Sequence, residues 1–338
     1  MESHAQLRAR RLPVLACMRA PRFIPPGTLV EVTMRTNAAR LHLRPSAALN
    51  AAILGIIGRA LDKYPVLIHA FVVLSNHWHA LLTASDAKAQ ADFLRYVHGN
   101  IAKAAQELNG VLGKVWQQRA RVIPILDEEA QRDRLRYLLA HGTKEHLVAS
   151  PLLWPGVTSA RAMAAGEGRM PATWENRTLR SSLERAARRA RARAGSTEPA
   201  GPIHPAHYTK RYPIVLTPLP VHEAMTVPER AAEVRAIIAD IVSAHPGPHL
   251  GIRKVLAQSV MARPAEPSCA RPPLCHTRYP ALYARYCELR CDFVAAYRRA
   301  ALRHLERPTL AAFPVDVFLP TSVFVPVART PRLAVMLV

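Results

Sequence analysis

Residues 71–82 read FVVLSNHWHALL, and this stretch decides the expected fold. Apolar and β-branched residues stand on both sides of the polar pair Ser75-Asn76. Alternating apolar runs that are separated by a short polar turn are typical of a β-hairpin. We therefore expect two antiparallel strands, over residues 66–74 and 77–83, and the order of the other elements is worked out from them.

The two histidines of this hairpin are candidate metal ligands. Residues two apart in a strand point to the same face, so His77 and His79 project together and Trp78 points the other way. Two neutral imidazoles side by side on a rigid strand form half of a divalent-metal site. The alternative is a pair of histidines on a half-exposed sheet face, and the motif alone does not decide between the two.

The elements around the hairpin alternate strands with amphipathic helices. Ser46 is the expected N-cap of the first helix, and Pro124 places the last strand at a sheet edge or a bulge. This order is the split β-α-β arrangement of a ferredoxin-like antiparallel sheet with one extra helix. We expect an α+β domain in which two helices cover one sheet face and the other face is free for a ligand. The expected strands and helices cover residues 28–35, 46–64, 66–74, 77–83, 87–109 and 121–126, followed by a helix that begins at Asp127 or Asp133.

The composition indicates a polyanionic partner. The chain has 338 residues and a net charge of +22, with a pI of about 10.8. Such an excess of cations favours nucleic acid. No apolar run is long enough to span a bilayer, and residues 1–20 read as a basic arm, not as a signal peptide. Five cysteines whose spacing does not match paired zinc ligands predict buried free thiols in a cytoplasmic, nucleoid-associated protein.

The composition changes after residue 160, at the end of the first expected domain, residues 21–160. An Ala-rich, helix-prone run within residues 161–212 carries seven arginines and one glutamate. It predicts a DNA-binding helix or tail, and a solvated charged face is the alternative. Residues 195–211 read as a linker, and residues 213–338 read as a mainly α-helical region of unknown role. The candidate DNA contacts of the run are Arg185, Arg188 and Arg189.

Four segments within residues 21–160 support a more specific interpretation. They are NHWH at 76–79, WQQR at 116–119, LRYLL at 135–139 and LVASP at 147–151. In this order they resemble the catalytic HUH endonuclease domain of the single-tyrosine transposases of insertion sequences. Within that family they are most similar to the REP-associated tyrosine transposases.

The resemblance implies a metal-dependent single-stranded DNA endonuclease and strand transferase. Tyr137 would be the nucleophile, which forms a 5′-phosphotyrosine and leaves a 3′-hydroxyl. The cofactor would be Mg²⁺ or Mn²⁺, the partner single-stranded or hairpin DNA ends, and the assembly a homodimer.

The chain departs from the family pattern directly after Tyr137. The family usually has an Asn-Pro-x-Arg segment, in which the Asn stands one helical turn after the tyrosine, and His141 occupies that place here. His141 lies on the same helix face as Tyr137, so it can complete a site with His77 and His79. An all-imidazole site would also take Zn²⁺. The alternative for His141 is an interaction with the helix dipole.

Further residues are candidate DNA contacts. Trp116 and Arg119 could stack on and grip a single strand, with Arg121 adding phosphate attraction, and a core Trp and a surface Arg are the alternatives. Two other functions stay open. One is a nucleic-acid-binding regulator that keeps the fold without the chemistry. The other is an RNA-binding module, which needs aromatic residues on the open sheet face, where Trp78 is the candidate.

Overall fold

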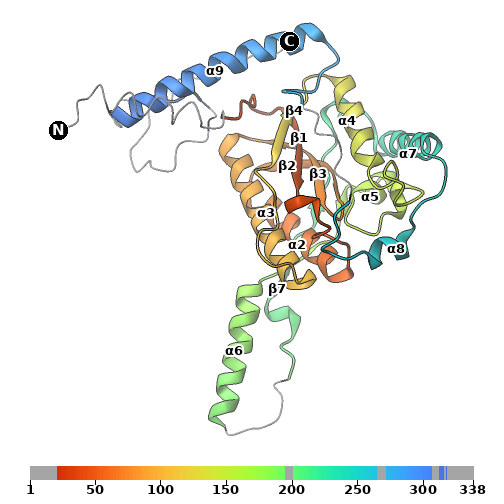
Figure 1. The fold of residues 1–338 in the computed structure, drawn as a ribbon, viewed down its shortest axis with the longest axis vertical. Helices are drawn as coiled ribbons and strands as arrows, with labels where there is room; N and C mark the ends of the chain where they lie inside the picture. The colour runs from red at the N-terminus through yellow and green to blue at the C-terminus, as the bar shows by residue number, and fades with distance from the viewer. Residues whose placement is uncertain (1–20, 195–200, 265–271, 307–311, 316, 318–338) are drawn as a thin grey trace.

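The computed structural model describes residues 21–194, 201–264, 272–306, 312–315 and 317 (Figure 1). The expected arm at residues 1–20 and most of the C-terminal tail lie outside the described residues. The hairpin and the order of elements in the first half of the chain are confirmed. In chain order these elements are β1 (Leu29–Arg35), α2 (Ala47–Lys63), β2 (Val66–Val73), β3 (His77–Ala84), α3 (Ala87–Asn109), β4 (Arg121–Pro124) and α4 (Glu128–Ala140).

The strands form one antiparallel sheet in the order β2-β3-β1-β4. The edge position of β4 is the one that Pro124 predicted, since proline lacks the N–H that an inner strand must donate. The helix starts are also as expected, because Ser46 and Asp127 accept hydrogen bonds from Leu49 N and Ala130 N. These caps satisfy backbone donors that the first helical turn leaves unpaired.

Helices α2 and α3 cover one face of the sheet and form the first core with it. Trp78 is fully buried there, and its indole N–H donates to His98 Nε2 at 2.9 Å. Trp116 is also in this core, and its indole N–H donates to the His98 carbonyl at 2.8 Å. Neither ring has an exposed face on which a base could stack. Trp116 could have been a core residue or a platform for DNA bases, and its buried position is that of a core residue. Trp78 is buried as well, so it does not provide the exposed aromatic face that an RNA-binding module needs.

The other face of the sheet is not free, which corrects the expectation from the sequence. Helix α4, with α5 (Ala160–Ala165) and α7 (Val227–Ala244), packs over this face and forms a second core. The apolar stripe of α7 includes Val234, Ile238 and Ile241, and it lies in the same cluster as Leu81 of β3. A stripe of that size must be buried for the helix to be stable, and it is buried against α4 and α5, which lie between α7 and the sheet.

The segments after residue 160 therefore return to the body of the protein. Part of the expected linker, residues 209–211, forms a strand, and residues 195–200 lie outside the described residues. The remaining elements are β5 (Arg169–Met170), β6 (Thr173–Glu175), α6 (Arg177–Arg193), β7 (Thr209–Arg211), β8 (Ile214–Val215), α8 (Ile252–Ala257) and α9 (Pro280–Glu306), with short 3₁₀ turns at Asn37–Ala39, Pro151–Leu153, Pro205–His207 and Pro220–His222.

The cysteines and the surface bear on two further expectations. Cys275 is a buried free thiol as expected, but Cys287 is only partly buried and Cys291 is exposed. Cys269 lies outside the described residues. In the part of the chain that the structure describes, no helix is both long and apolar enough to cross a membrane.

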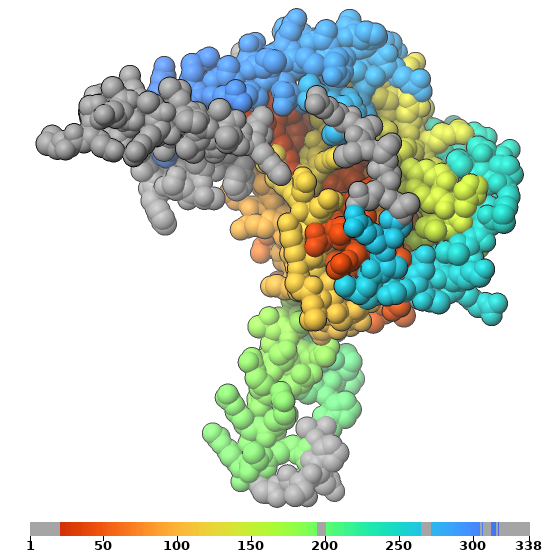
Figure 2. All heavy atoms as spheres, in the orientation of Figure 1, coloured from red at the N-terminus to blue at the C-terminus, as the bar shows by residue number. Residues whose placement is uncertain are grey.

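Helix α6 stands away from the body as an arm (Figures 1 and 2). None of its side chains is buried. The chain enters it through β6 and returns through β7, and these two strands pair with each other. At this root Gly55 and Gly58 of α2 lie directly against the backbone of Thr173 and Tyr212. The absence of two side chains on α2 therefore lets the root of the arm pack on the helix.

We predict that Gly58→Ala destabilises the protein although alanine is the better helix former. Helix propensity favours alanine by about 1 kcal/mol, but its Cβ would overlap the Tyr212 carbonyl oxygen. We expect a net loss of about 1–3 kcal/mol, as for other overpacked sites, measured by chemical denaturation. Gly99→Ala in α3 is the matched control, because nothing lies within 4 Å of its Cβ position. An equal gain in the free energy of unfolding in Gly58→Ala and Gly99→Ala would contradict the close contact between Gly58 and the Tyr212 backbone.

Candidate metal and tyrosine site

The site lies where β3 meets the C-terminal end of α4. Antiparallel pairing sets Arg35 of β1 opposite His77 and Thr33 opposite His79. Helix α4 ends at Ala140, and His141 follows as its C-cap with extended backbone angles, φ −60° and ψ 139°. The end of the helix thus brings Tyr137 and His141 to the face of β3 that bears the histidines.

The three predicted histidines form a compact cluster. The ring centroids of His77 and His79 are 5.0 Å apart, those of His79 and His141 are 4.2 Å apart, and those of His77 and His141 are 5.4 Å apart. One nitrogen from each ring can be chosen so that all three lie within 4.8 Å of one another. All three rings are nearly buried, with exposed fractions of 9%, 5% and 2% for His77, His79 and His141.

Each histidine has an acceptor at Nδ1, which sets its tautomer. His77 Nδ1 lies 2.7 Å from Asn76 Oδ1, His79 Nδ1 lies 3.1 Å from Glu31 Oε1, and His141 Nδ1 lies 2.8 Å from the Tyr137 carbonyl oxygen. An N–H at Nδ1 that donates to these oxygens leaves the lone pair of every ring at Nε2. Three imidazoles that share this tautomer are the arrangement found where histidines bind a metal through Nε2.

The electrostatics of the cluster keep these rings neutral. Burial lowers the pKa of His79 and lowers the pKa of His77 and of His141 well below 6.5. The nearby cation of Lys144 lowers all three further. Neutral imidazole is the form that binds metal ions. The donor set therefore fits a divalent cation, and its three nitrogens suit Mn²⁺ or Zn²⁺ better than Mg²⁺, which prefers oxygen ligands.

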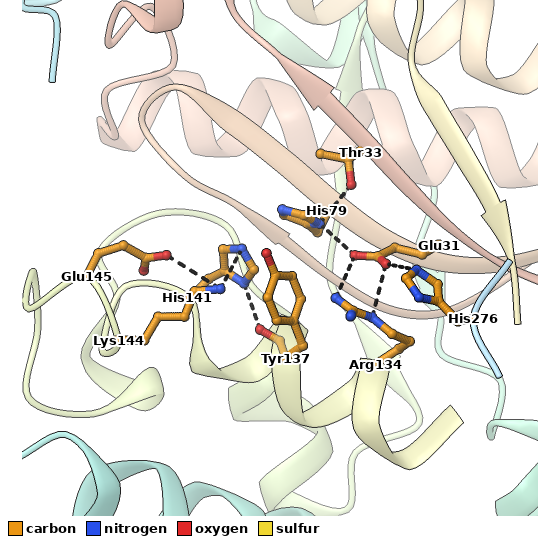
Figure 3. Close-up of polar contacts among 9 residues, drawn as sticks. All are labelled: Glu31, Thr33, His79, Arg134, Tyr137, His141, Lys144, Glu145 and His276. Atoms are coloured by element: carbon orange, nitrogen blue, oxygen red, sulfur yellow. Dashed lines mark hydrogen bonds and ion pairs between the residues drawn. The ribbon is translucent and has the colours of Figure 1, made fainter. Parts of the chain in front are cut away.

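Tyr137 lies at the mouth of the cluster. Its ring centroid is 4.7 Å from that of His141 and 5.8 Å from that of His79. Two cations flank the ring, with Arg134 Cζ at 3.9 Å and Lys144 Nζ at 3.5 Å from its centroid. Figure 3 shows the hydroxyl pointing toward the strand that bears His79. Because Tyr137 is 40% exposed, a large substrate can reach the phenol while the imidazoles stay in the interior.

A buried carboxylate that the sequence analysis missed supports this arrangement. Glu31 of β1 accepts from His79 through Oε1, and its Oε2 lies 3.1 Å from Arg134 Nε and 2.8 Å from His276 Nε2 (Figure 3). Burial alone would raise the pKa of Glu31, but its contacts with His276, His79 and Arg134 outweigh that effect and hold the pKa far below 4.5. An ionised carboxylate on the outer nitrogen of a ligand histidine fixes the orientation of the ring.

The sequence carried a signal for some of the missed residues. Glu31 is a carboxylate in an apolar strand, two positions from Thr33 and therefore on the same face. Arg134 stands three residues before Tyr137, which places it on the same side of α4. His276 is remote in sequence and follows no motif. Of the remaining predicted residues, Arg121 is exposed at the start of β4, Arg119 is exposed just before it, and Arg185, Arg188 and Arg189 are exposed on the α6 arm.

Comparisons with known proteins gave a limited result. No family model and no curated protein matches the sequence. Among solved structures, the chain is similar to a REP-associated tyrosine transposase bound to a REP hairpin, with 20% identity and a TM-score of 0.36 over 44% of this chain and 86% of that chain. It is also similar to a protein assigned as a transposase from Deinococcus radiodurans R1, with 16% identity and a TM-score of 0.26 over 36% of this chain and 95% of that chain. Both TM-scores lie below 0.5, so any case for a function rests on the side chains themselves.

We predict that Mn²⁺ binds at the three histidines. A ligand that binds only the folded protein stabilises it by about 2.7 kcal/mol at 100 times its Kd, so Mn²⁺ should raise Tm. His77→Ala, His79→Ala and His141→Ala should each weaken Mn²⁺ binding about tenfold or more in titration calorimetry, because an outer-shell change alone costs that much.

His69→Gln is the matched control for these substitutions. His69 is as buried as the three histidines of the cluster, but its ring nitrogens contact the Thr217 and Pro218 carbonyls and Thr83 Oγ1. We expect this variant to lose stability and to keep its Mn²⁺ affinity. Loss of binding in His69→Gln with unchanged binding in the three alanine variants would rule out the proposed ligands.

Proposed function

We propose that this protein is a metal-dependent single-stranded DNA endonuclease and strand transferase of the transposase type. One observation carries the proposal, which is the convergence of an exposed phenol and three buried, neutral imidazoles. A phenol is a weak nucleophile, and phosphodiester cleavage needs a group that stabilises charge on the phosphoryl oxygens. The cluster of His77, His79 and His141 has the donors to hold such a group beside Tyr137.

In the proposed reaction Tyr137 Oη attacks a backbone phosphorus of the DNA. The new bond joins Oη to phosphorus, and the P–O3′ bond breaks, so the downstream fragment stays on the protein as a 5′-phosphotyrosine. The phenol proton leaves to solvent, and the departing O3′ takes up a proton to become a free 3′-hydroxyl. A cation bound at the histidines would polarise a phosphoryl oxygen and stabilise the charge that develops there. Attack by the 3′-hydroxyl of a second strand reverses the step and joins the strands.

The chain's own cations suit a phosphate at this position. Arg134 and Lys144 lie against the Tyr137 ring, so a phosphate that approaches the phenol enters a positive field. Arg119 and Arg121 are exposed beside the β4 edge, and we assign them contacts with the phosphates of the strand that leads to Tyr137. The sheet order β2-β3-β1-β4 with α2 and α3 on one face agrees with the ferredoxin-like domain expected for this chemistry.

We assign the α6 arm a second contact with the nucleic acid. Its root is held by ion pairs, from Arg177 to Glu107 at 3.1 Å and from Arg180 to Glu175 at 2.7 Å. Among the described residues no acidic side chain pairs with Arg185, Arg188 or Arg189, all of which are exposed. A root held by ion pairs that carries exposed guanidinium groups away from the body suits the backbone of a DNA stem, with no base contact required.

We predict a covalent complex that depends on Tyr137. A randomised single-stranded DNA pool with a 3′ fluorophore is incubated with the protein and Mn²⁺ and then separated under denaturing conditions. The label should move with the protein, and the released fragment should carry a 3′-hydroxyl that a polymerase extends. Tyr137→Phe removes only the attacking oxygen, and we expect it to abolish the complex.

Tyr283→Phe is the control for this assay, because Tyr283 is 38% exposed and lies on α9. It should form the complex at the wild-type rate. A complex that survives in Tyr137→Phe would exclude Tyr137 as the nucleophile. DNA binding without any covalent complex would favour the alternative, a regulator that binds nucleic acid without cleaving it.

We predict that the arm contributes to the salt dependence of DNA binding. The triple substitution of Arg185, Arg188 and Arg189 by glutamine should reduce the slope of log K against log salt concentration by about 2–3, since each phosphate contact contributes about 0.7–0.9. The charge-matched control replaces Lys88, Arg95 and Lys103, which are exposed on α3, by glutamine. Equal changes in both triple variants would show that the arm acts only through net charge.

A further inference from the structure

A segment from the far C-terminal part of the chain is built into the side of the candidate site. His276 forms a parallel bridge with Ile125, directly after β4. Its N–H donates to the Pro124 carbonyl at 2.8 Å, and its carbonyl accepts from Leu126 N at 3.0 Å. Residues 272–279 thus extend the edge of the sheet at the point where the chain leaves β4 for α4, the helix that carries Tyr137.

The same segment also holds the start of α4. Arg278 N donates to Asp127 Oδ2 at 2.9 Å, and Arg278 Nε lies 2.5 Å from Asp133 Oδ2. Asp127 is the N-cap of α4. The contacts of Arg278 therefore attach the segment to the helix, and they do so without touching Glu31 or any of the three histidines.

The side chain of His276 makes a different contact, which leads to the centre of the site. Its Nε2 lies 2.8 Å from Glu31 Oε2, and both side chains are largely buried. The other oxygen of Glu31 accepts from His79 Nδ1 at 3.1 Å and from Arg134 Nη2 at 3.3 Å. Arg134 in turn lies on the ring of Tyr137. One carboxylate thus links His276 to a metal-ligating imidazole and to the guanidinium beside the nucleophile (Figure 3).

We propose that His276 is a positioning residue for the metal and tyrosine site, so that the C-terminal segment 272–279 is part of the catalytic unit. His276 holds one oxygen of Glu31 in place, and this fixes the direction in which the other oxygen faces His79. A free carboxylate could rotate about its last bond and would leave the His79 ring without a fixed acceptor. Outer partners of this kind change metal affinity by about 10- to 100-fold when they are removed.

The test compares three variants of the full chain with Mn²⁺ alone as the probe. His276→Ala removes the contact with Glu31, and we expect Mn²⁺ to bind about tenfold or more weakly in titration calorimetry. His276→Gln keeps an N–H donor near the position of Nε2, and it should recover most of the affinity. Arg278→Ala loosens the same segment from Asp133 but leaves Glu31 untouched, and its Mn²⁺ affinity should stay within about twofold of wild type.

The outcomes separate positioning from simple packing. Wild-type Mn²⁺ affinity in His276→Ala would overturn the proposal, as would equal losses in His276→Ala and Arg278→Ala, because the segment would then act only by docking. If His276→Ala does not fold, His276→Gln decides between the two roles. A folded Gln variant that binds Mn²⁺ as tightly as Arg278→Ala supports the positioning role. A folded Gln variant that loses as much Mn²⁺ affinity as His79→Ala contradicts it.

A second test measures the formation of the covalent complex, and it rests on the proposed function. Its result is independent of the Mn²⁺ titrations. In the covalent-complex assay, His276→Ala should lower the rate constant at saturating DNA and leave the DNA concentration for half-saturation within about twofold. If wild-type protein forms no covalent complex, the proposed chemistry fails, but the Mn²⁺ titrations still decide whether His276 positions the ligands.

Discussion

The pairing of β3 with β1 is the constraint on which the candidate site depends. Its register sets Met34 opposite Trp78 and Thr33 opposite His79, so Trp78 enters the core under α2 and α3 while the flanking histidines face α4. Because side chains alternate along a strand, a slip of one residue would turn both imidazoles into the apolar core under α2 and α3 and the indole toward α4. Burial of Trp78 and its bond to His98 thus stabilise the register that presents His77 and His79 to α4.

The end of α4 supplies the second half of the geometry through its own backbone. The last carbonyl groups of a helix have no partner within the helix, and one of them belongs to Tyr137. This carbonyl accepts from His141 Nδ1. The residue proposed as the nucleophile therefore also sets the tautomer of the third histidine of the cluster, and a single helix turn fixes both groups relative to each other. Gly142 follows at φ +88°, and Lys144, two residues later, lies 3.5 Å from the centroid of the Tyr137 ring.

Local patterns in the sequence were enough to predict the hairpin, the helix caps, the edge position of β4 and the pairing of His77 with His79 on one strand face, whereas Tyr137 and His141 were predicted from the resemblance to a family. These features depend on neighbours within a few residues, which periodicity and capping rules describe. The covering of the second sheet face depends on α4 and α5, which pack on it, and on α7, which packs on them, and no local pattern encodes that. Glu31 and His276 meet only because the chain returns to the β4 edge at the end of the fold. For Trp116 the sequence favoured a place in the core and a stacking contact with DNA about equally.

The paired roots of the α6 arm have a consequence for how such a protein can diversify. The chain leaves the body through β6 and re-enters through β7, which lie side by side, so the whole excursion begins and ends at one place. Segments with adjoining ends can be lengthened, shortened or exchanged with little effect on the remaining fold. The arm is thus a replaceable module, and changes in its length or charge need not disturb the geometry around Tyr137.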